Sequence, residues 1–591
     1  MPTSAPQRTA LLAAAIAAAA APSLLAYNVA PSPTFLNQAL AFALWAVFVV
    51  VTGPTTLRGR AAPLYAALLL LTGAVAQSWL FGALAAPLAL SAIATLAAAA
   101  VVAAGGCGVR ADAEDVFAAF CWGWVVAGGF SVAIAAIQVF APGIPDGEWL
   151  AISGIAGRAV GNLRQPNHLS SLLLWSCIAV IGLLELGRLG PRATRWAAAL
   201  MAAFVFAVVL SASRTGLVSV LMLALWGALD RRLSRPARRI LIGAPLAYAL
   251  AWFAMAGWAT LSQHAFGGEA RLAETDISSS RFGIWRDTLA LIRMYPWTGV
   301  GWGEFNLAWT LTPFPHRPTA FFDHTHNLLL QFAVELGLPM AALLTALLVW
   351  ALLRAALQAW ATPGGLGAAR RCAVLMVLMI AVHSQLEYPL WYSYFLLPTA
   401  WALGFALQGR GAAVPALPSR LLAVAALVVI GATALSLLDY RRVTLIFDES
   451  AGATPLEARI ASGQRSLFFG HHADYAAVTT GVKIPGNTHG FDRAVHYLLD
   501  TRLMIAWAEA LNRSGRVDLA RDLAARLREF RKSDAAEFFA PCPSGATPVE
   551  AAKRPFQCEL PERVHDWREF LAPGATAAPA AAAASAASAA N

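Results

Sequence analysis

The residues of this chain best suited to chemistry gather in a few polar segments, and the longest of these segments covers residues 260–327. It contains Arg281 and ends with Asp323, His324 and His326. An imidazole titrates near neutral pH and can take a proton from a hydroxyl, while a neighbouring carboxylate can orient the ring. A guanidinium can give two parallel hydrogen bonds to a phosphate. These residue types predict acid–base chemistry beside an anion site; the alternatives are a capping or packing histidine and a solvated loop arginine.

Three more polar segments interrupt otherwise apolar sequence. They read RAVGNLRQPNH (158–168), SASRTG (211–216) and HSQLEYPLWYSY (383–394). Polar and charged residues beside lipid are costly and usually face a cavity or the aqueous edge of the membrane. Because each segment adjoins an apolar stretch, we expect all four segments to lie at one face of a membrane. Together they can build one site there, with chemistry on a lipid-tethered substrate.

The elements that must position these segments are membrane-spanning helices. The 591-residue chain is 58% hydrophobic and 13% charged, with a mean hydropathy of +0.60, whereas a soluble domain carries about 25% charged residues. This composition excludes an ordinary soluble enzyme and predicts an all-α integral membrane protein. We count about thirteen candidate spans, near residues 10–28, 38–53, 63–80, 83–104, 115–141, 168–187, 196–211, 214–229, 240–259, 328–353, 372–385, 390–408 and 421–438.

The arginines predict the orientation, because short cytoplasmic loops are enriched in basic residues. With the N-terminus inside, and the first apolar stretch retained, the short external loops hold only Arg158, Arg164 and Arg214. The cytoplasmic loops hold many more, namely Arg58, Arg60, Arg110, Arg188, Arg192, Arg195, Arg231, Arg232, Arg235, Arg238, Arg239, Arg354, Arg370, Arg371, Arg410 and Arg420. Residues 260–327 and the tail 439–591 then lie outside the cytoplasm, which in a bacterium is the periplasm. Arg441 and Arg442, after the last span, count against this topology.

The placement of the polar residues separates two functional classes. Transporters hold substrates near the bilayer midplane, on broken helices, whereas the mid-span positions here are mainly Ala, Leu and Val. A transporter or flippase for a lipid-linked glycan is therefore the alternative from another class. The net charge of +10 comes almost wholly from arginine, which fits loops between spans better than a nucleic-acid surface.

The spacing of several motifs resembles one family. Arg281-x3-Trp285, Tyr295-Pro296-x2-Gly299-x-Gly301-x-Gly303-x-Phe305 and Asp323-His324-x-His326-Asn327, followed by LLLQFAVELGLP, resemble the O-antigen ligase and polymerase superfamily. Within that superfamily, GNLRQPNHLSSLL (161–173), LEYPLWYSYFLLP (386–398) and a helical external tail are most similar to the bacterial protein O-linked oligosaccharyltransferases of the pilin glycosylation ligase type.

The resemblance implies a membrane-embedded glycosyltransferase of the bacterial inner membrane, GT-C-like in fold, whose active site faces the periplasm. Such an enzyme moves a preassembled glycan from undecaprenyl diphosphate to Ser or Thr of a secreted protein such as pilin. The alternatives inside the superfamily are an O-antigen ligase, which uses lipid A core as acceptor, and a polysaccharide polymerase. The resemblance implies no cofactor and, in the ligase branch, no metal.

The resemblance also assigns roles to residues. Arg214 and Arg281 are expected to bind the diphosphate and to stabilise the leaving group; the alternative for Arg214 is snorkelling at a helix start. His326, directly before a span, is preferred over His324 as the base, and Glu387 can assist it or hold an arginine. A metal site at Asp323, His324 and His326 is a lesser alternative, since histidines two apart alternate faces and further ligands from His316 or His383 would be required.

The remaining candidates are expected to contact substrate. Gln165, Asn167 and His168 lie at the external mouth of a span and suit hydrogen bonds to glycan hydroxyls, the alternative being N-capping by Asn167. Tyr388 follows Glu387, and it can instead be one of the interfacial tyrosines. The full set of expected substrate contacts is Arg158, Arg164, Gln165, Asn167, His168, Asp323, His324 and Tyr388.

These patterns predict five segments. Residues 1–259 and 328–438 hold the membrane spans, and the loop 260–327 separates them. A helical tail follows over residues 439–572, and a disordered Ala/Ser/Pro end over residues 573–591. Residues 501–531 show a three- and four-residue apolar period broken at Ser514-Gly515, which predicts a helical hairpin. Cys542 and Cys558 are close enough in sequence to pair in an oxidising compartment, and Cys107, Cys121, Cys177 and Cys372 are expected to be packing residues.

Overall fold

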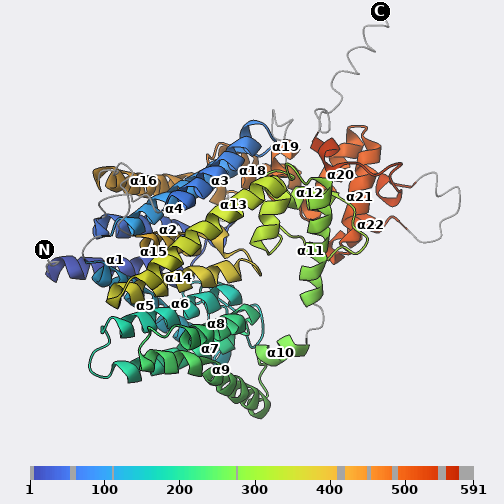
Figure 1. Cartoon of the computed structure of the whole chain (residues 1–591). Coiled ribbons are helices and arrows are strands. Elements are labelled where there is room, and N and C mark those ends of the chain that lie inside the picture. The colour runs from blue at the N-terminus through green and yellow to red at the C-terminus, as the bar shows by residue number, and fades with distance from the viewer. Residues whose placement is uncertain are drawn as a thin grey trace, which may run out of the picture. The chain divides into compact units, whose positions relative to one another are not determined.

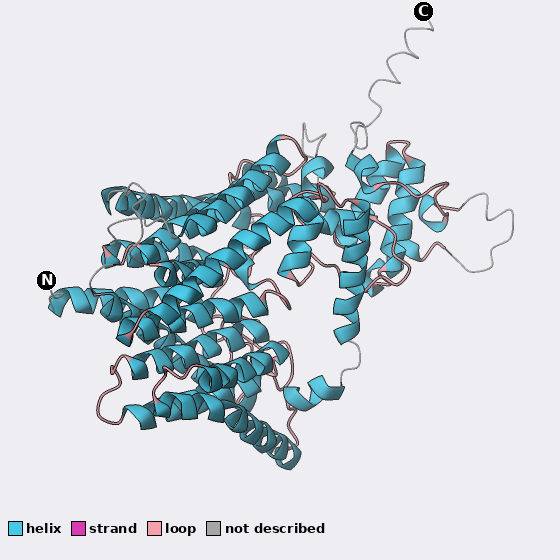
Figure 2. Cartoon of the chain, viewed as in Figure 1, coloured by secondary structure: helices cyan, strands magenta, loops and turns pink. Residues whose placement is uncertain are grey.

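The protein is helical throughout the part that the computed structural model describes (Figures 1 and 2). That part comprises residues 5–53, 61–109, 112–273, 277–408, 419–448, 454–481, 490–542 and 554–571. Within these ranges the only extended pairing is an isolated bridge between Val29 and Ser32. The predicted all-α class is therefore confirmed. Arg58, Arg60, Arg110, Arg410 and the low-complexity end 573–591 lie outside the described residues.

Ten of the described helices are long and apolar enough to cross a membrane. They are α2 (Phe35–Thr52), α3 (Ala62–Leu80), α4 (Ala86–Cys107), α5 (Ala113–Phe140), α6 (Pro166–Glu185), α7 (Ala193–Ser211), α9 (Arg235–Ser262), α13 (Leu328–Ala361), α14 (Gly364–His383) and α16 (Ser419–Thr444). Helices α8 (Arg214–Leu229) and α15 (Ser393–Leu407) are apolar but shorter. A multi-pass membrane protein is thus confirmed, whereas the count of thirteen spans is not, since α1 (Ala5–Leu24) is not among the ten.

The chain forms two compact units. The first contains residues 1–70, 94–275 and 344–437, and the second contains 71–93, 276–343 and 438–591. Four of the five boundaries fall inside helices, namely α3, α4, α13 and α16. The first unit therefore holds most of the apolar helices, and the second holds most of the predicted loop, from residue 276 on, together with the tail.

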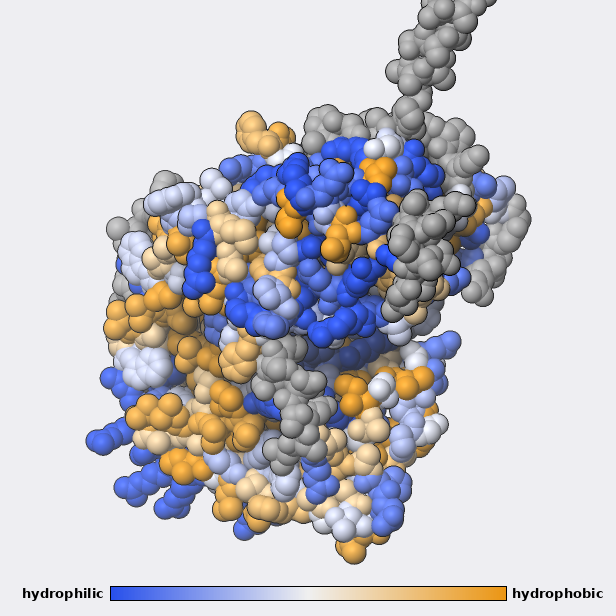
Figure 3. Space-filling model, turned by 90° about the vertical axis from the view of Figure 1, so that its right-hand side faces the viewer, coloured by the Kyte–Doolittle hydropathy of each residue, from blue (hydrophilic) through white to orange (hydrophobic). Residues whose placement is uncertain are grey.

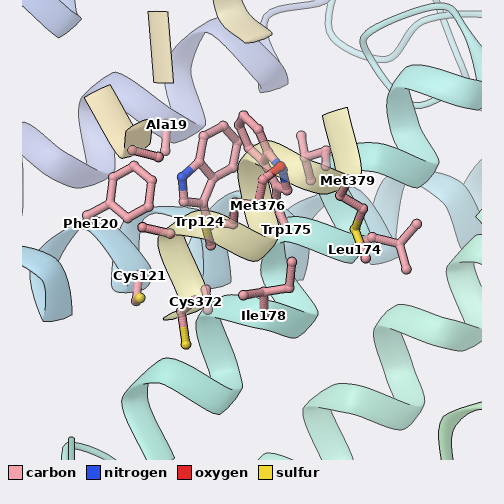
Figure 4. Close-up of a cluster of buried hydrophobic side chains, with 14 of the residues drawn as sticks. Ala19, Phe120, Cys121, Trp124, Leu174, Trp175, Ile178, Cys372, Met376 and Met379 are labelled. Carbon is pink, nitrogen blue, oxygen red and sulfur yellow. The ribbon is translucent and has the colours of Figure 1, made fainter. Parts of the chain in front are cut away.

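Helix α6 is the central helix of the first unit. Of its most apolar window 94% is buried, against 17% for α9. Trp175 of α6 packs edge-on against Trp124 of α5, with ring centroids 4.7 Å apart, and its indole N–H donates to the carbonyl of Met376. Figure 4 shows these side chains beside Met379 and Cys372. Dense packing around α6 gives its polar N-terminal turn a fixed position.

Small residues let helices of this unit approach closely. A Cβ added at Gly106 of α4 would lie 2.2 Å from the carbonyl oxygen of Trp401 in α15, and one at Gly404 would lie 2.2 Å from that of Ala103. This backbone-to-backbone contact is typical of helix pairs in membranes. The four cysteines predicted to be packing residues, Cys107, Cys121, Cys177 and Cys372, are all buried and free.

The outer helices expose apolar side chains instead of burying them. Leu246, Leu250, Phe253 and Leu261 of α9 are each more than 60% exposed. Figure 3 shows hydrophobic side chains, in orange, over wide areas of the visible surface. A surface of this kind is stable against lipid and would be unusual on a soluble protein.

The second unit has a core of its own. The loop contributes α11 (Ile277–Met294) and α12 (Phe305–Leu311), and the tail contributes α17 (Leu456–Gly463), α18 (Gly470–Thr479), α19 (Gly490–Ala494), α20 (Thr501–Arg513), α21 (Val517–Glu529), α22 (Ala536–Phe539) and the short 3-10 turns η3 (Ser533–Ala535), η4 (Phe556–Cys558) and η5 (Trp567–Leu571). Trp309 of the loop and Trp507 of the tail are buried in the same apolar cluster. Loop and tail therefore fold as one body.

Two predictions about the tail are confirmed. Helices α20 and α21 form a hairpin that turns at Gly515, whose φ of +80° favours glycine. Cys542 and Cys558 form a disulfide with a Cα–Cα distance of 5.1 Å.

Candidate functional site

Polar side chains of the first unit meet where α6 begins. Asn167 donates its amide N–H to the carboxylate of Glu387, 3.0 Å away, and its amide oxygen accepts from the hydroxyl of Ser213 at 2.7 Å. Ser170 donates to the same Ser213 hydroxyl at 3.0 Å. All four side chains are buried. Asn167 thus joins the polar segments 158–168, 211–216 and 383–394, which were predicted to lie together.

Asn167 does not cap α6, although N-capping was the alternative role predicted for it. Gln165 is the N-cap residue, and its side-chain oxygen accepts the backbone N–H of His168 at 2.7 Å. Pro166 occupies the first turn, where its missing N–H leaves no bond unmade. The amide of Asn167 is consequently available for the bridge to Glu387.

The polar network extends one turn further into α6. His168 Nδ1 lies 3.1 Å from the hydroxyl of Tyr394, and Ser171 Oγ lies 2.8 Å from His383 Nδ1. His168, Ser171, His383 and Tyr394 are all buried. His168 therefore packs among aromatic side chains, and its contact with substrate stays a prediction.

Arg214 is the first residue of α8. The preceding Ser213 caps this helix by accepting the backbone N–H of Gly216 at 3.0 Å. Arg214 itself is exposed. Because one hydroxyl both caps α8 and binds Asn167, the backbone position of Arg214 is tied to that of Glu387.

Two further candidate arginines, Arg158 and Arg164, lie in the loop before α6. Arg158 is buried, and its Nε donates to the carbonyl of Ser211 at 3.1 Å. Arg164 adopts a left-handed φ of +57° and donates to the carbonyl of Pro33 at 3.3 Å. Arg158 thereby supports the turn that precedes Arg214, while Arg164 is half-buried at the surface.

Tyrosines cover the same end of the first unit. Tyr388 is half-buried and stacks on Tyr392 with a centroid distance of 6.1 Å and an interplanar angle of 20°. The ring of His168 lies edge-on to Tyr392 at 4.6 Å. A stack of aromatic rings beside Asn167 and Glu387 has the composition of a small-molecule site, apolar faces with a few fixed polar groups.

The histidine loop, residues 323–327, belongs to the second unit. His326 has a left-handed φ of +54°, an uncommon conformation for a residue with a Cβ, and its ring lies edge-on to Phe322 at 5.5 Å. Trp285 donates its indole N–H to the carbonyl of Thr325 at 2.9 Å, and Gln331 accepts the Thr325 backbone N–H at 2.8 Å. The loop is therefore held from α11 on one side and from α13 on the other. Such strained residues cluster at functional sites.

Asp323 contacts the other histidine. Its carboxylate lies 3.1 Å from Nδ1 of His324. Partial burial alone would raise the pKa of Asp323, but the contact with His324, a backbone hydrogen bond and the charge of His326 together lower the pKa below its usual value. Asp323 is thus ionised, with its side chain 46% exposed to solvent. It can fix the tautomer of His324 and supply negative charge near His326.

Arg281 lies near the start of α11 and is half-buried. Within the next three turns Ile284, Asp287, Thr288 and Leu291 form the buried face of the helix, so Arg281 is carried on a helix whose packing is fixed. Arg286, on the same helix, is exposed and pairs with Asp287 at 3.1 Å.

The glycine run 299–303 has a defined partner. The backbone N–H of Val300 donates to Val334 at 2.8 Å, that of Gly301 donates to the carbonyl of Glu335 at 3.0 Å, and that of Gly303 donates to the Glu335 carboxylate at 3.1 Å. Helix α13 breaks here, since Gly337 has φ +75° and ψ +162°. A Cβ at Gly299 would lie 2.5 Å from the Glu335 carbonyl, which explains the glycine. The glycine run therefore docks on the break in α13.

The structure adds residues that motif reading did not select. Ser213 and Ser170 complete the Asn167 network, and Gln331 fixes the histidine loop. The role of the two serines was hard to predict from the sequence, because serines are common near helix starts. Among the described residues no group of three or more His, Cys, Asp or Glu side chains is arranged to hold a metal ion.

Comparisons with known proteins point in the same direction. Residues 197–345 match the O-antigen ligase family model, residues 372–539 match the C-terminal region of the virulence factor membrane-bound polymerase family, and residues 159–184 match the protein glycosylation ligase family.

Two curated relatives come from Acinetobacter baylyi. The chain is 28% identical to the general O-oligosaccharyltransferase over 258 residues, which is 42% of this chain and 43% of the relative. It is 26% identical to the ComP-specific O-oligosaccharyltransferase over 268 residues, 44% and 45% of the two chains. The match thus spans less than half of each relative. The resemblance read from the motifs is confirmed.

Proposed function

We propose that this multi-pass membrane protein, similar to the O-oligosaccharyltransferases of the O-antigen ligase superfamily, transfers a preassembled glycan from undecaprenyl diphosphate to Ser or Thr hydroxyls of secreted proteins. It acts at the periplasmic face of the bacterial inner membrane. Its acceptor is a pilin-like protein and its donor a lipid-linked glycan. The activity of the relatives supports this proposal, and so does the location of polar residues at one end of the apolar unit.

One observation carries the proposal. The stretch that matches the protein glycosylation ligase family, 159–184, contains Asn167, whose amide bridges Glu387 and Ser213. Ser213 directly precedes Arg214 and caps its helix. A residue of the stretch that matches this family therefore connects the buried carboxylate of Glu387 to the helix that begins at Arg214, a candidate for binding the diphosphate.

The reaction follows from the residue types. The acceptor hydroxyl oxygen attacks the anomeric carbon, the bond from that carbon to the diphosphate breaks, and undecaprenyl diphosphate leaves with the bonding electrons. His326 accepts the hydroxyl proton, and Asp323 balances the charge that forms nearby. Arg214 and Arg281 hold the diphosphate by bidentate hydrogen bonds that strengthen as charge builds on it. Glu387, held by Asn167, assists the base or holds an arginine.

Substrate binding is assigned to the aromatic and amide residues. Gln165, His168 and Tyr388 flank the start of α6, and their hydroxyl-, amide- and ring-based contacts suit a glycan. Arg158 and Arg164 lie in the preceding loop as further diphosphate contacts. Asn167 uses both ends of its amide for hydrogen bonds to Glu387 and Ser213, so its main role is to position these two residues.

A second candidate function is O-antigen ligase activity. The O-antigen ligase family matches residues 197–345, a longer stretch than the glycosylation ligase match over residues 159–184. The same donor chemistry then ends on a sugar of lipid A core. The residue roles at the diphosphate would be unchanged, so only the acceptor distinguishes the two functions.

Reconstitution with both acceptors tests the proposal. The purified protein is given undecaprenyl-diphosphate glycan with a pilin-like protein or with lipid A core. We expect glycan on the protein only, detected as a mass increase on a Ser- or Thr-containing peptide. Transfer to lipid A core alone would replace the proposal by the ligase function. As internal controls, Arg214→Lys and Arg281→Lys should keep part of the activity that the alanine variants lose, because lysine retains charge but not the bidentate fork.

A further inference from the structure

The C-terminal tail makes direct polar contacts with the part of the 260–327 loop that precedes Asp323 and the two histidines. His496 Nδ1 lies 2.8 and 2.9 Å from the carboxylate oxygens of Glu304, and both side chains are buried. Three residues later, the backbone N–H of Leu499 donates to the side chain of Asn306 at 2.8 Å. Glu304 and Asn306 begin α12. The tail segment around residue 497 is therefore fixed relative to α12.

The same helix is joined to the histidine loop. Asn306 accepts from Leu499 through its oxygen and donates through its nitrogen to the carbonyl of Phe322 at 2.8 Å. Phe322 packs edge-on against His326. A chain of direct contacts thus runs from the tail through one asparagine to the residue that packs on the candidate base.

Tyr497 is the exposed residue of this fastened segment. It is 41% exposed, whereas Val495, His496 and Leu499 around it are buried. Its ring lies 4.4 Å from that of His471 at 41° and 5.0 Å from that of His472 at 74°. The Tyr497 ring packs on two histidine rings and is partly exposed to solvent, so it is held in place for contact with a ligand. Its side chain therefore loses little conformational entropy on binding.

The histidines behind this ring are uncharged. Burial, followed by the neighbouring His472, lowers the pKa of His471 well below its usual value, and burial lowers the pKa of His472 to about 4. Two neutral rings give Tyr497 an apolar support at neutral pH. They would not by themselves attract an acidic ligand.

Tyr497 also belongs to the surroundings of Asp323. The partial burial of its ring raises the pKa of the Tyr497 phenol, and the charge of Asp323 raises the pKa further. The phenol therefore stays protonated as a donor within electrostatic reach of the carboxylate. An aromatic face, a hydroxyl donor and an ionised carboxylate together match a pyranose ring, which has apolar C–H faces and hydroxyls at its edge.

We propose that Tyr497, contributed by the C-terminal tail, contacts a sugar of the donor glycan beside the histidine loop. The proposal rests on the glycan-transfer function above, and it assigns the tail a role in donor binding. The ring stacks on the sugar face, and Asp323 accepts from a sugar hydroxyl. The neutral, rigid and aromatic character of the position favours a sugar over a peptide segment, which would require exposed backbone donors and acceptors.

The test compares Tyr497 variants in the full-length protein. Tyr497→Ala should raise the KM for undecaprenyl-diphosphate glycan about tenfold, the effect of losing one aromatic contact of about 1.4 kcal/mol, with kcat within about twofold. Tyr497→Trp should keep a KM close to that of the wild type. Tyr475→Phe is the matched control, because its phenol also lies in the tail but donates to Asp500 at 2.7 Å; its KM should not change.

Three results would overturn the inference. They are an unchanged donor KM in Tyr497→Ala, a rise in the acceptor KM only, and a loss in Tyr497→Ala that Tyr497→Trp shares in full. Direct binding of the same lipid-linked glycan to wild-type and Tyr497→Ala protein in nanodiscs separates this inference from the proposed function. Weaker binding by the variant supports the tail contact even if no protein acceptor is glycosylated, while a wild-type protein that transfers and a variant that binds equally well refute the contact alone.

Discussion

The amide of Asn167 lies 3.0 Å from the carboxylate of Glu387, across 220 residues of sequence, and both side chains are buried. The oxygen of the same amide binds Ser213 at 2.7 Å. A buried amide with both ends paired fixes the geometry around it, because leaving either partner unpaired costs free energy. Asn167 therefore couples the positions of Glu387 and of the helix that begins at Arg214.

This coupling predicts a specific effect of Asn167→Ala. The change removes one hydrogen-bond donor to the buried Glu387 and the acceptor of the Ser213 hydroxyl, which should destabilise the protein by about 1–3 kcal/mol and reduce transfer more than donor binding. Thermal unfolding and donor titration in detergent measure the two effects. Asn512→Ala, in the tail hairpin, is the control and should change neither. Wild-type stability and turnover in Asn167→Ala would show that the bridge has no role.

The same relationship shows what sequence can and cannot predict. The four polar segments stood out because polar residues are rare in apolar sequence, and three of them meet at one end of the first unit. The partner of Asn167 could not be predicted, since its amide is equally suited to cap a helix, and only the fold reveals that Gln165 caps α6 while Asn167 reaches Glu387.

The break in α13 and the contacts of the tail could not be predicted from the sequence. A single apolar run predicted one span from residue 328, but Gly337 interrupts the helix where the glycine run 299–303 docks. His496 and Glu304 are 192 residues apart, so no local pattern marks Tyr497. Pairings over such distances depend on tertiary packing and leave no periodic signal.

Acidification should destabilise the second unit. Burial holds the pKa of His472 at about 4 in the folded protein, whereas the unfolded chain titrates near 6.5. The unfolded state therefore binds more protons between these values, and the stability that His472 contributes above pH 6.5 is lost as the pH falls toward 4. The loss should amount to about 3 kcal/mol. Unfolding midpoints from pH 7.5 to 4.5 measure it, and His472→Phe should flatten the dependence. An unchanged slope in that variant would contradict the assignment.

The disulfide should stabilise the tail without entering the chemistry. Cys542 and Cys558 close a loop with a sequence separation of 16, which corresponds to about 3 kcal/mol in the chain-entropy model. The double serine variant should unfold at lower temperature yet transfer glycan normally below that temperature, and removal of residues 573–591 should have no strong effect. Free thiols at both positions in non-reducing peptide mapping of periplasmically folded protein would disprove the pairing there.

The proposed topology makes a prediction for reporter fusions. Because loop arginines concentrate on one side, a fusion after residue 235 should report cytoplasm, and fusions after residues 310 and 460 should report periplasm. Alkaline phosphatase and green fluorescent protein fusions read the two compartments independently. A cytoplasmic residue 310 would exclude the histidine loop from a periplasmic reaction.

The central claim, that this protein is a glycosyltransferase with His326 as its base, is tested most directly by transfer in detergent with one aqueous compartment and no membrane potential. Under these conditions wild-type protein should move glycan from undecaprenyl diphosphate to an acceptor hydroxyl. His326→Ala should lose most turnover, by about 10²–10⁴-fold, while binding the donor nearly as tightly, because a base acts on the acceptor proton. Loss of turnover in His324→Ala with full activity in His326→Ala would move the base to His324. No transfer by the wild-type protein, which is the result expected of a flippase, would contradict the claim.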